Sequence, residues 1–124
     1  MQLPRTARLL RPADFAALKQ HGKRFTTRHF VIEHRPNAAA ARLGMAVSRR
    51  VSKKAVERNR IRRQIREQFR LNQPRLPHAD VLVIARPSAA GRPNADLRLD
   101  LDLVWHKLAA LKEGDAPGTM RADS

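Results

Sequence analysis

The strongest periodic pattern of apolar residues lies in the middle of the chain, over residues 53–71. Ile61, Ile65 and Phe69 recur every four residues, so on an α-helix they fall within about 80° of one another. Pro74 follows soon afterwards and ends the pattern, because proline lacks the N–H that a helix interior needs. The segment therefore predicts an amphipathic helix with a narrow apolar face.

Residues 95–111 predict a second amphipathic helix. Its apolar residues follow one another at steps of three and four: Leu97, Leu101, Val104, Leu108 and Leu111. We expect Trp105 to pack against the core as a partly buried side chain. The acidic residues of this segment are expected on its solvated face: Asp96, Asp100 and Asp102.

Alternation of apolar and polar residues over 28–34 predicts a strand. Phe30 and Ile32 would point to one side of a sheet, and Val31 and Glu33 to the other. Residues 24–27 predict a short strand before it, and residues 42–48 a further full strand. Residues 80–85 are apolar almost throughout, which is typical of a strand in the centre of a sheet or beside a parallel neighbour.

One more helix is predicted ahead of these strands. Pro12 and Asp14 are typical of a first helical turn. Phe15 and Leu18 share a face at three-residue spacing, and Gly22 ends the segment. Helices that alternate with strands of one sheet in this way predict an α+β sandwich.

The 124 residues suit one small domain, which we place at residues 1–113. Residues 1–11 are expected to form a loose basic arm, and residues 114–124 a disordered tail. The absence of cysteine excludes disulfides, thiol nucleophiles and cysteine-based zinc sites. No apolar run approaches the roughly 18 residues of a membrane span, and the first residues lack the apolar stretch of a signal peptide. We therefore expect a soluble, cytoplasmic protein.

The chain is strongly basic, with 26 Lys and Arg against 11 Asp and Glu and a formal net charge of +15. Residues 1–93 carry 22 basic and 5 acidic side chains, whereas residues 94–124 carry 4 basic and 6 acidic ones. The positive charge thus belongs to the body of the domain. A field of this sign favours a polyanionic partner, either a nucleic acid or an anionic membrane.

The basic charge is densest around the central helix. Between Arg42 and Arg70 there are 11 basic residues, and the only acidic ones are Glu57 and Glu67. An ordinary solvated helix face interleaves Glu with Lys, so this composition indicates an external counter-charge. Arginine outnumbers lysine within the helix, which favours bidentate contacts with phosphate.

Helical geometry places a ridge of polar side chains away from the apolar stripe: Asn59, Arg63, Arg66 and Arg70. Arg60 lies farther round the helix. Arg62 lies at the boundary, where its stem can cover apolar surface while its guanidinium stays in water. Arg58 falls inside the apolar arc, so we expect it to emerge where the first turn overhangs the sheet.

The predicted start of this helix breaks a local rule. Ser52 is a plausible N-cap, yet Lys53 and Lys54 follow it. Cations at a helix N-terminus oppose the macrodipole and typically cost about 0.3–1 kcal/mol each. Together with free backbone N–H groups, however, they form a strong anion site.

Other classes of partner and activity fit the residues less well. Membrane binding would need bulky apolar side chains beside the basic face, but those of the central helix are needed by the core. The spacings of a helix-turn-helix or a coiled coil, typical of duplex-DNA readers, are absent. His21, His29 and His34 could suggest an acid–base pair, but His29 and His34 lie on opposite faces of a regular strand. The residues by themselves therefore indicate an RNA-binding α+β protein.

One run of residues is more specific. Residues 54–67 contain Arg-Asn-Arg at 58–60 followed by Ile-Arg-Arg at 61–63, and this run resembles the signature of the bacterial ribonuclease P protein family. Further segments agree with the family pattern: Asp14-Phe15, His21-Gly22, Arg28-His29-Phe30-Val31, residues 43–48 and residues 81–86. The resemblance spans about residues 5–111.

The resemblance implies a two-layer αβββαβα sandwich, ribonuclease P protein-like (ribosomal S5 domain 2-like), with a left-handed β-α-β crossover. It implies the accessory subunit of a ribonucleoprotein endoribonuclease, in which the catalytic RNA removes the 5′ leader of precursor tRNA. The protein itself would then carry no catalytic residues. A structural RNA-binding protein, such as a ribosomal or chaperone-like component without a processing role, is the alternative.

The family resemblance also implies partners and a cofactor. The implied partners are the ribonuclease P RNA subunit and the precursor tRNA 5′ leader, with the protein a monomer in a one-protein, one-RNA complex and no membrane involved. The protein alone would bind no cofactor. The Mg²⁺ of the holoenzyme would be held mainly by RNA.

Positions that match the family motif predict the site residues. RNA contacts are predicted at Arg49, Arg50, Lys53, Lys54, Arg58, Asn59, Arg60, Arg62, Arg63 and Arg66. The cleft for the leader is predicted at Phe15, Lys19, Val31 and Glu33. The family often has aromatic residues where this chain has Lys19 and Glu33, so leader bases would stack less here and Lys19 would contribute charge. Phe15 could equally be a core residue.

Overall fold

The structure is a computed structural model, and it describes residue 15, residue 18 and residues 22–38 and 40–114, with side chains through residue 111. The strands are β1 (Lys23–Thr26), β2 (Phe30–Pro36), β3 (Arg42–Ala46) and β4 (Ala79–Ala85). The helices are α3 (Ala55–Asn72) and α4 (Asn94–Gly114), with short 3-10 turns η1 (Gln73–Arg75) and η2 (Pro87–Ala89). Every predicted strand is present, with ends shifted by one or two residues.

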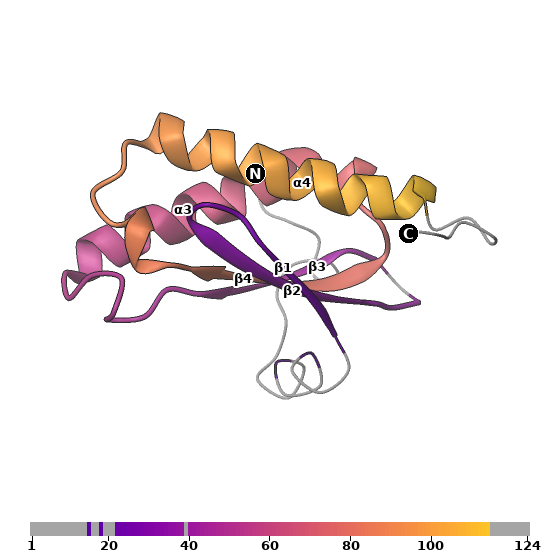
Figure 1. Ribbon diagram of the computed structural model, residues 1–124, viewed down its shortest axis with the longest axis horizontal. Helices are drawn as coiled ribbons and strands as arrows, with labels where there is room; N and C mark the ends of the chain where they lie inside the picture. Colours follow the sequence, from indigo (N-terminus) through magenta and orange to yellow (C-terminus); the bar gives the residue numbers. More distant parts are fainter. Residues whose placement is uncertain (1–14, 16–17, 19–21, 39, 115–124) are drawn as a thin grey trace.

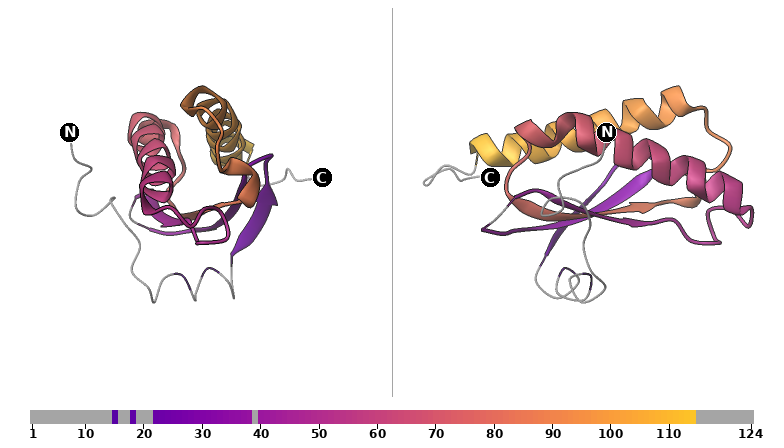
Figure 2. Two further views of the ribbon diagram at one scale, coloured as in Figure 1. Left: turned by 90° about the vertical axis from the view of Figure 1, so that its left-hand side faces the viewer. Right: turned by 180° about the vertical axis from the view of Figure 1, so that it is seen from behind.

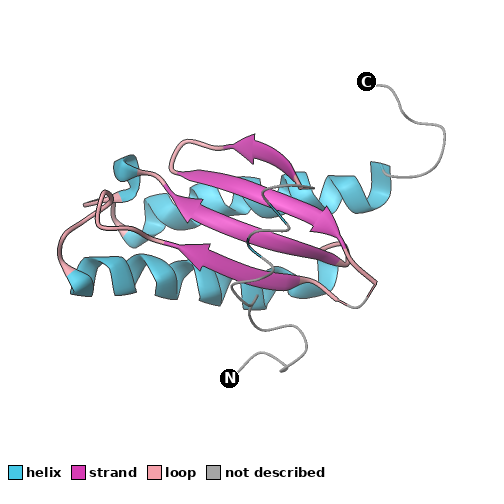
Figure 3. Cartoon of the chain, turned by 90° about the horizontal axis from the view of Figure 1, so that it is seen from below, coloured by secondary structure: helices cyan, strands magenta, loops and turns pink. Residues whose placement is uncertain are grey.

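The four strands form one sheet in the order β1-β2-β4-β3. β2 is antiparallel to both β1 and β4, whereas β3 and β4 are parallel. The chain passes from β3 to β4 through α3, which lies on the same face of the sheet as α4 (Figure 1). Seen with the helices behind the sheet, as in Figure 3, this crossover is left-handed, unlike about 98% of such connections. The fold implied by the family resemblance is thus confirmed.

The main core lies between the sheet and the two helices, which run side by side across it (Figure 2). Ile61, Ile65 and Phe69 of α3 are fully buried, as the four-residue spacing predicts. Burial of such a side chain contributes about 1.5–3 kcal/mol. The same face of the sheet supplies Phe30 and Ile32 from β2, which confirms the predicted alternation.

Trp105 is more deeply buried than predicted. We expect partial burial from the sequence, but its exposed fraction is 0%. Its ring meets that of Phe69 edge-on, with 5.9 Å between the centroids. The reason is that α4 packs against α3 as well as the sheet, so a second flank of α4 is enclosed. Leu111, by contrast, is 41% exposed at the far end of the stripe.

The expectation for Asp100 is wrong. Its side chain is not on a solvated face but is buried, with 6% exposure. The carboxylate accepts hydrogen bonds from Thr27 Oγ1 at 2.7 Å, His29 N at 2.8 Å and Arg28 N at 3.3 Å. This face of α4 lies over the turn between β1 and β2, whose backbone donors need an acceptor.

The opposite face of the sheet buries a smaller apolar cluster. Leu18 and Leu82 are its buried members, and Phe15, Ala46 and Ile84 pack against them. Phe15 and Leu18 are helical, but the rest of the helix predicted to begin at Pro12 lies outside the described residues. The expected arm at 1–11 and most of the expected tail lie outside them too, and Gly114, where we expect the tail to begin, is the last residue of α4.

Gly22 follows Leu18 at a point where no side chain fits. The Gly22 N–H donates to the Leu18 carbonyl at 2.8 Å. A Cβ at residue 22 would lie 2.5 Å from that same oxygen, well inside van der Waals contact. The close approach gives a steric reason for the glycine that the sequence places at the end of this segment.

Candidate RNA-binding surface

The face of α3 that points away from the core carries a ridge of polar side chains, which we call the α3 ridge: Asn59, Arg63 and Arg66. All three are exposed, while Ile61 and Ile65 between them are fully buried. Neither Arg63 nor Arg66 makes a hydrogen bond or an ion pair within the described residues. Both guanidinium groups are therefore open to an external anion as far as the described residues are concerned.

Arg70, predicted on the same ridge, differs from these two. Its guanidinium pairs with Glu67 one turn earlier, and Arg70 is half-buried. The Glu67 carboxylate accepts from Arg70, and this hydrogen bond lowers the pKa of Glu67 below its ordinary value. The free part of the ridge therefore ends near Arg66.

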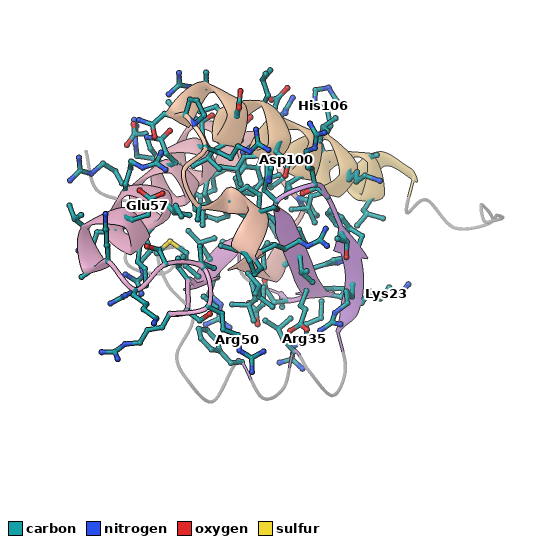
Figure 4. The ribbon with its side chains drawn as sticks, turned by 60° about the vertical axis from the view of Figure 1, so that its left-hand side comes forward. Lys23, Arg35, Arg50, Glu57, Asp100 and His106 are labelled. Atoms are coloured by element: carbon teal, nitrogen blue, oxygen red, sulfur yellow. The ribbon has the colours of Figure 1, made fainter. Side chains whose placement is uncertain are left out.

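The connection from β3 to α3, residues 47–54, holds four more cations outward, and we call it the basic loop. Its exposed cations are Arg49, Arg50, Lys53 and Lys54. Val51 is buried between them and anchors the loop, and its N–H closes a turn onto the Ser48 carbonyl at 3.0 Å. Figure 4 shows Arg50 at the lower edge of the protein.

Ser52 is not the N-cap of α3, contrary to the prediction. The N-cap is Lys54, and no side chain caps the helix. Ser52 Oγ instead accepts from the Lys54 N–H at 3.2 Å, outside the helix. Because residues 48–51 form a turn, the chain reaches helical geometry only at Ala55. Lys53 and Lys54 thus lie at a helix N-terminus without a side-chain cap, where backbone N–H groups also favour an anion.

Arg58 emerges from the apolar arc as expected. It is half-buried, and its Nη1 donates to the carbonyls of Ser52 and Lys53, each at 3.0 Å. The guanidinium thereby satisfies two loop carbonyls and fastens the basic loop to the helix. This positioning role follows from the loop's course and has no signal in the sequence.

Arg60 is engaged within the protein. Its Nε and Nη2 donate to the Glu57 carboxylate at 2.9 and 2.7 Å, and its Nη1 donates to Asn94 Oδ1 at 2.6 Å. Glu57 also accepts from the Gly91 N–H at 2.8 Å. Hydrogen bonds from Arg60 and then Gly91 lower the pKa of Glu57 to about 2. Sequence reasoning missed Asn94 and Gly91 as partners, because they lie 34 residues away along the chain.

Arg62 lies at the edge of the apolar face, as predicted. Its Nη1 donates to Asn59 Oδ1 at 2.9 Å, and its Nη2 donates to the Val47 carbonyl at 3.2 Å. The first bond leaves the Asn59 amide N–H groups available on the α3 ridge. The ten predicted contact residues thus divide into cations that have no side-chain partner in the described part of the chain and residues that hydrogen-bond to the rest of the protein.

The predicted leader cleft lies on the other face of the sheet. Val31 is half-buried there, and Phe15 packs on the cluster of Leu18 and Leu82. Glu33 is 5% exposed, and its Oε2 accepts from Arg24 Nη2 at 2.6 Å. Glu33 is therefore an enclosed carboxylate that is paired with Arg24. Lys19, the remaining predicted residue, lies outside the described residues.

Two described histidines have separate environments. His29 Nδ1 lies 2.9 Å from Ser88 Oγ, whereas the ring of His34 packs on Phe25 with 5.7 Å between centroids. Burial lowers the pKa of both imidazoles. This separation agrees with the expectation that they do not form an acid–base pair.

We also searched the described residues for metal-binding groups and membrane-spanning helices. Among them, no group of three or more His, Asp or Glu side chains could hold a metal ion. Nor is any helix in this part of the chain long and apolar enough to cross a bilayer.

Comparison with known proteins gives concordant matches. A sequence model described as ribonuclease P matches residues 3–109. The ribonuclease P protein component of Idiomarina loihiensis is 40% identical over 107 residues, covering 85% of this chain and 86% of the relative. That of Legionella pneumophila (strain Corby) is 39% identical over 104 residues, covering 83% and 90%.

Solved structures agree in fold. The RNase P protein from Staphylococcus aureus superposes with a TM-score of 0.75 at 31% identity, covering 82% of this chain and 95% of that one. The RNase P protein from Thermotoga maritima gives a TM-score of 0.72 at 30% identity, covering 80% and 96%.

Proposed function

Because this chain belongs to the ribonuclease P protein family, we propose that its α3 ridge and basic loop bind the RNA subunit of that enzyme. The family is the protein subunit of a ribonucleoprotein endoribonuclease in tRNA processing, and its RNA is the catalyst. The chain is accordingly an accessory subunit that assists the catalytic RNA. Which residues make the contacts is the part that we propose.

The proposed RNA contacts rest on one observation: some arginines of α3 bond to the protein, whereas others do not. Arg63 and Arg66 have no internal partner among the described residues, although eleven basic residues crowd between positions 42 and 70. Unpaired guanidinium groups repel one another, and phosphates relieve that repulsion through short bidentate hydrogen bonds. Lys53 and Lys54 extend the same field at the N-terminus of α3.

Arg58, Arg60 and Arg62 border this surface and support it. Each uses part of its guanidinium on a carbonyl, amide or carboxylate oxygen of the protein. We propose that their remaining N–H groups face RNA. We therefore assign these three residues a double role, in which they position the α3 ridge and contribute charge to the phosphate contacts.

The precursor tRNA leader is proposed to lie on the opposite face of the sheet. Phe15 and Val31 supply its apolar surface there. The enclosed pair of Glu33 with Arg24 gives this face a polar floor where the family often has an aromatic residue. Base stacking should accordingly contribute less, and backbone contacts more, than in relatives with that aromatic residue.

The proposal extends to the stoichiometry of the complex, its metal ion and its location in the cell. We infer a monomeric protein in a one-to-one complex with RNA, which acts in the cytoplasm. Mg²⁺ would be held mainly by RNA. The side chains of this protein contribute binding and orientation.

A reconstitution experiment tests the proposal. The protein is mixed with a ribonuclease P RNA and a precursor tRNA at low magnesium concentration, and cleavage at the mature 5′ end is measured. We expect the wild-type protein to increase cleavage and the double variant Arg63→Ala, Arg66→Ala to increase it less. No gain with the wild-type protein would instead favour a structural RNA-binding role.

A further inference from the structure

Three arginines outside α3 gather at the end of the molecule where α3 begins, and we call them the end cluster. Arg28 lies in the turn between β1 and β2, and Arg86 and Arg92 lie in the connection between β4 and α4. All three residues are exposed. Both segments lie at the same end of the sheet as the basic loop, at the left of Figure 1 and facing the viewer in the left panel of Figure 2.

Hydrogen bonds hold the two segments of the end cluster together. The Arg86 N–H donates to the His29 carbonyl at 2.8 Å, and Arg86 Nη1 donates to the carbonyls of Thr27 at 3.1 Å and Arg28 at 3.3 Å. Ser88 Oγ adds a bond to the Arg28 carbonyl at 3.0 Å. The turn that carries Arg28 and the segment that begins at Arg86 are therefore held against each other before any ligand binds.

The connection between β4 and α4 is also hydrogen-bonded to α3. Gly91 N donates to Glu57 Oε2 at 2.8 Å, and Arg60 Nη1 donates to Asn94 Oδ1 at 2.6 Å. Both contacts lie in the first turns of α3, next to the basic loop, and Figure 4 shows Glu57 in this position. The end cluster and the surface around α3 are thus parts of one scaffold.

Little negative charge offsets the end cluster. Asp100 is buried and accepts from the backbone and from Thr27. Asp96 lies 3.9 Å from Arg92, but both side chains are more than 40% exposed, and such pairs contribute about 0–1 kcal/mol. Within the described residues, the Arg28 guanidinium has no partner, and Arg86 donates side-chain hydrogen bonds only from Nη1.

We propose that Arg28, Arg86 and Arg92 bind the phosphodiester backbone of an RNA strand that continues from the basic loop around this end of the protein. All three are arginines, whose planar guanidinium suits phosphate oxygens better than an ammonium does. The surface would be a second RNA contact, beyond the α3 ridge. The inference rests on the proposed function, and its RNA is either the RNA subunit or the precursor tRNA.

The test removes charge without touching the scaffold. In the double variant Arg28→Ala, Arg92→Ala, neither lost guanidinium donates a hydrogen bond to the rest of the described protein. The matched control is Arg75→Ala, Lys107→Ala, which removes the same charge toward the other end of the helices. A third variant, Arg28→Lys, Arg92→Lys, keeps the charge. Thermal melts check that each variant retains the fold.

Two binding measurements distinguish the two sources of phosphate. The first titrates the free RNA subunit with each protein across a range of salt concentrations. The second titrates precursor tRNA with the reconstituted holoenzyme. We expect the double alanine variant to bind more weakly in at least one measurement, with a log–log salt slope shallower by about 1.5, because each lost phosphate contact removes roughly 0.7–0.9. The lysine variant should recover most of the slope.

The two binding measurements show which RNA, if any, the end cluster contacts. Weaker binding in the first measurement places the cluster on the RNA subunit, and weaker binding only in the second places it on the substrate. If the alanine variant matches the Arg75, Lys107 control in both, the inference is overturned. The variant Arg63→Ala, Arg66→Ala is measured in parallel. If it loses binding while the end-cluster variant does not, only the end cluster fails; if it also binds normally, the proposed function of the α3 ridge fails.

Discussion

The carboxylate of Glu57 lies 2.7 Å from Nη2 of Arg60, one turn along α3. The same Glu57 oxygen accepts from Gly91 N, and Arg60 reaches Asn94 at the start of α4. One ion pair on α3 thereby holds the connection before α4 in place. A motif that looks from the sequence like a uniform row of RNA contacts contains a structural clamp.

The clamp predicts a specific dependence of stability on pH. The pKa of Glu57 is lowered in the folded protein to about 2, against an ordinary value of 4.5. A lowered carboxyl pKa stabilises the fold above the ordinary value, and this contribution is lost as the pH falls from about 4.5 toward 2. Urea unfolding of Glu57→Gln should show about 1–2 kcal/mol less stability than wild type at pH 7.

The difference between the two proteins should shrink at low pH. As the pH falls from about 4.5 to 2, folded wild-type Glu57 loses its advantage over glutamine step by step, and most of that advantage should be gone only at about pH 2. A constant gap between the two unfolding curves from pH 7 to pH 2 would contradict the assignment of this stability to the ionised pair. Other carboxyls titrate in both proteins and cancel in the comparison.

The α3 ridge predicts that binding and stability respond to different residues. Arg63→Ala and Arg66→Ala should each make the salt dependence of RNA binding shallower by roughly 0.7–0.9 on a log–log plot. Their melting temperatures should stay close to that of the wild type, because neither side chain has a partner among the described residues. A large drop in melting temperature would show that these arginines support the fold.

The buried side of the same helix predicts the opposite behaviour. Ile65 is fully buried against the sheet, so Ile65→Ala should cost about 2–5 kcal/mol in the free energy of unfolding. RNA binding by the fraction that remains folded should change little. Leu71 is a control for apolar truncation on α3, because it is 57% exposed and Leu71→Ala should cost far less.

We expect the hydrogen bonds to Asp100 to stabilise the turn between β1 and β2. Asp100→Ala would leave the His29 N–H without its acceptor in a buried site, at about 1–3 kcal/mol for an unsatisfied group. The Thr27 hydroxyl would keep only its longer hydrogen bond to the Phe30 carbonyl, at 3.4 Å. Amide exchange at His29 should accelerate markedly in this variant. Asp102→Ala is the control, because its side chain is 60% exposed. Equal loss of stability in both variants would contradict the anchoring role.

The pattern of residues along the chain by itself determines which faces of the helices and strands are buried and which sign of partner the protein favours. The stripe of Ile61, Ile65 and Phe69 and the alternation around Ile32 identify the faces that become buried. They do so because the period of a helix or strand is local, and because apolar burial dominates the free energy of folding. The concentration of arginine over residues 58–70 likewise indicates a polyanionic partner, because an excess of one charge follows from composition alone.

Tertiary structure alone decides which polar side chains are free. Arg60 and Arg63 are both predicted RNA contacts, yet Arg60 meets Asn94, 34 residues away, while Arg63 is exposed. Asp100 looks like a surface residue until α4 crosses the turn that carries Thr27, 73 residues away. The left-handed passage from β3 to β4 is equally invisible to periodicity. These contacts depend on how segments that are distant in the sequence pack together. A local sequence pattern does not contain that information.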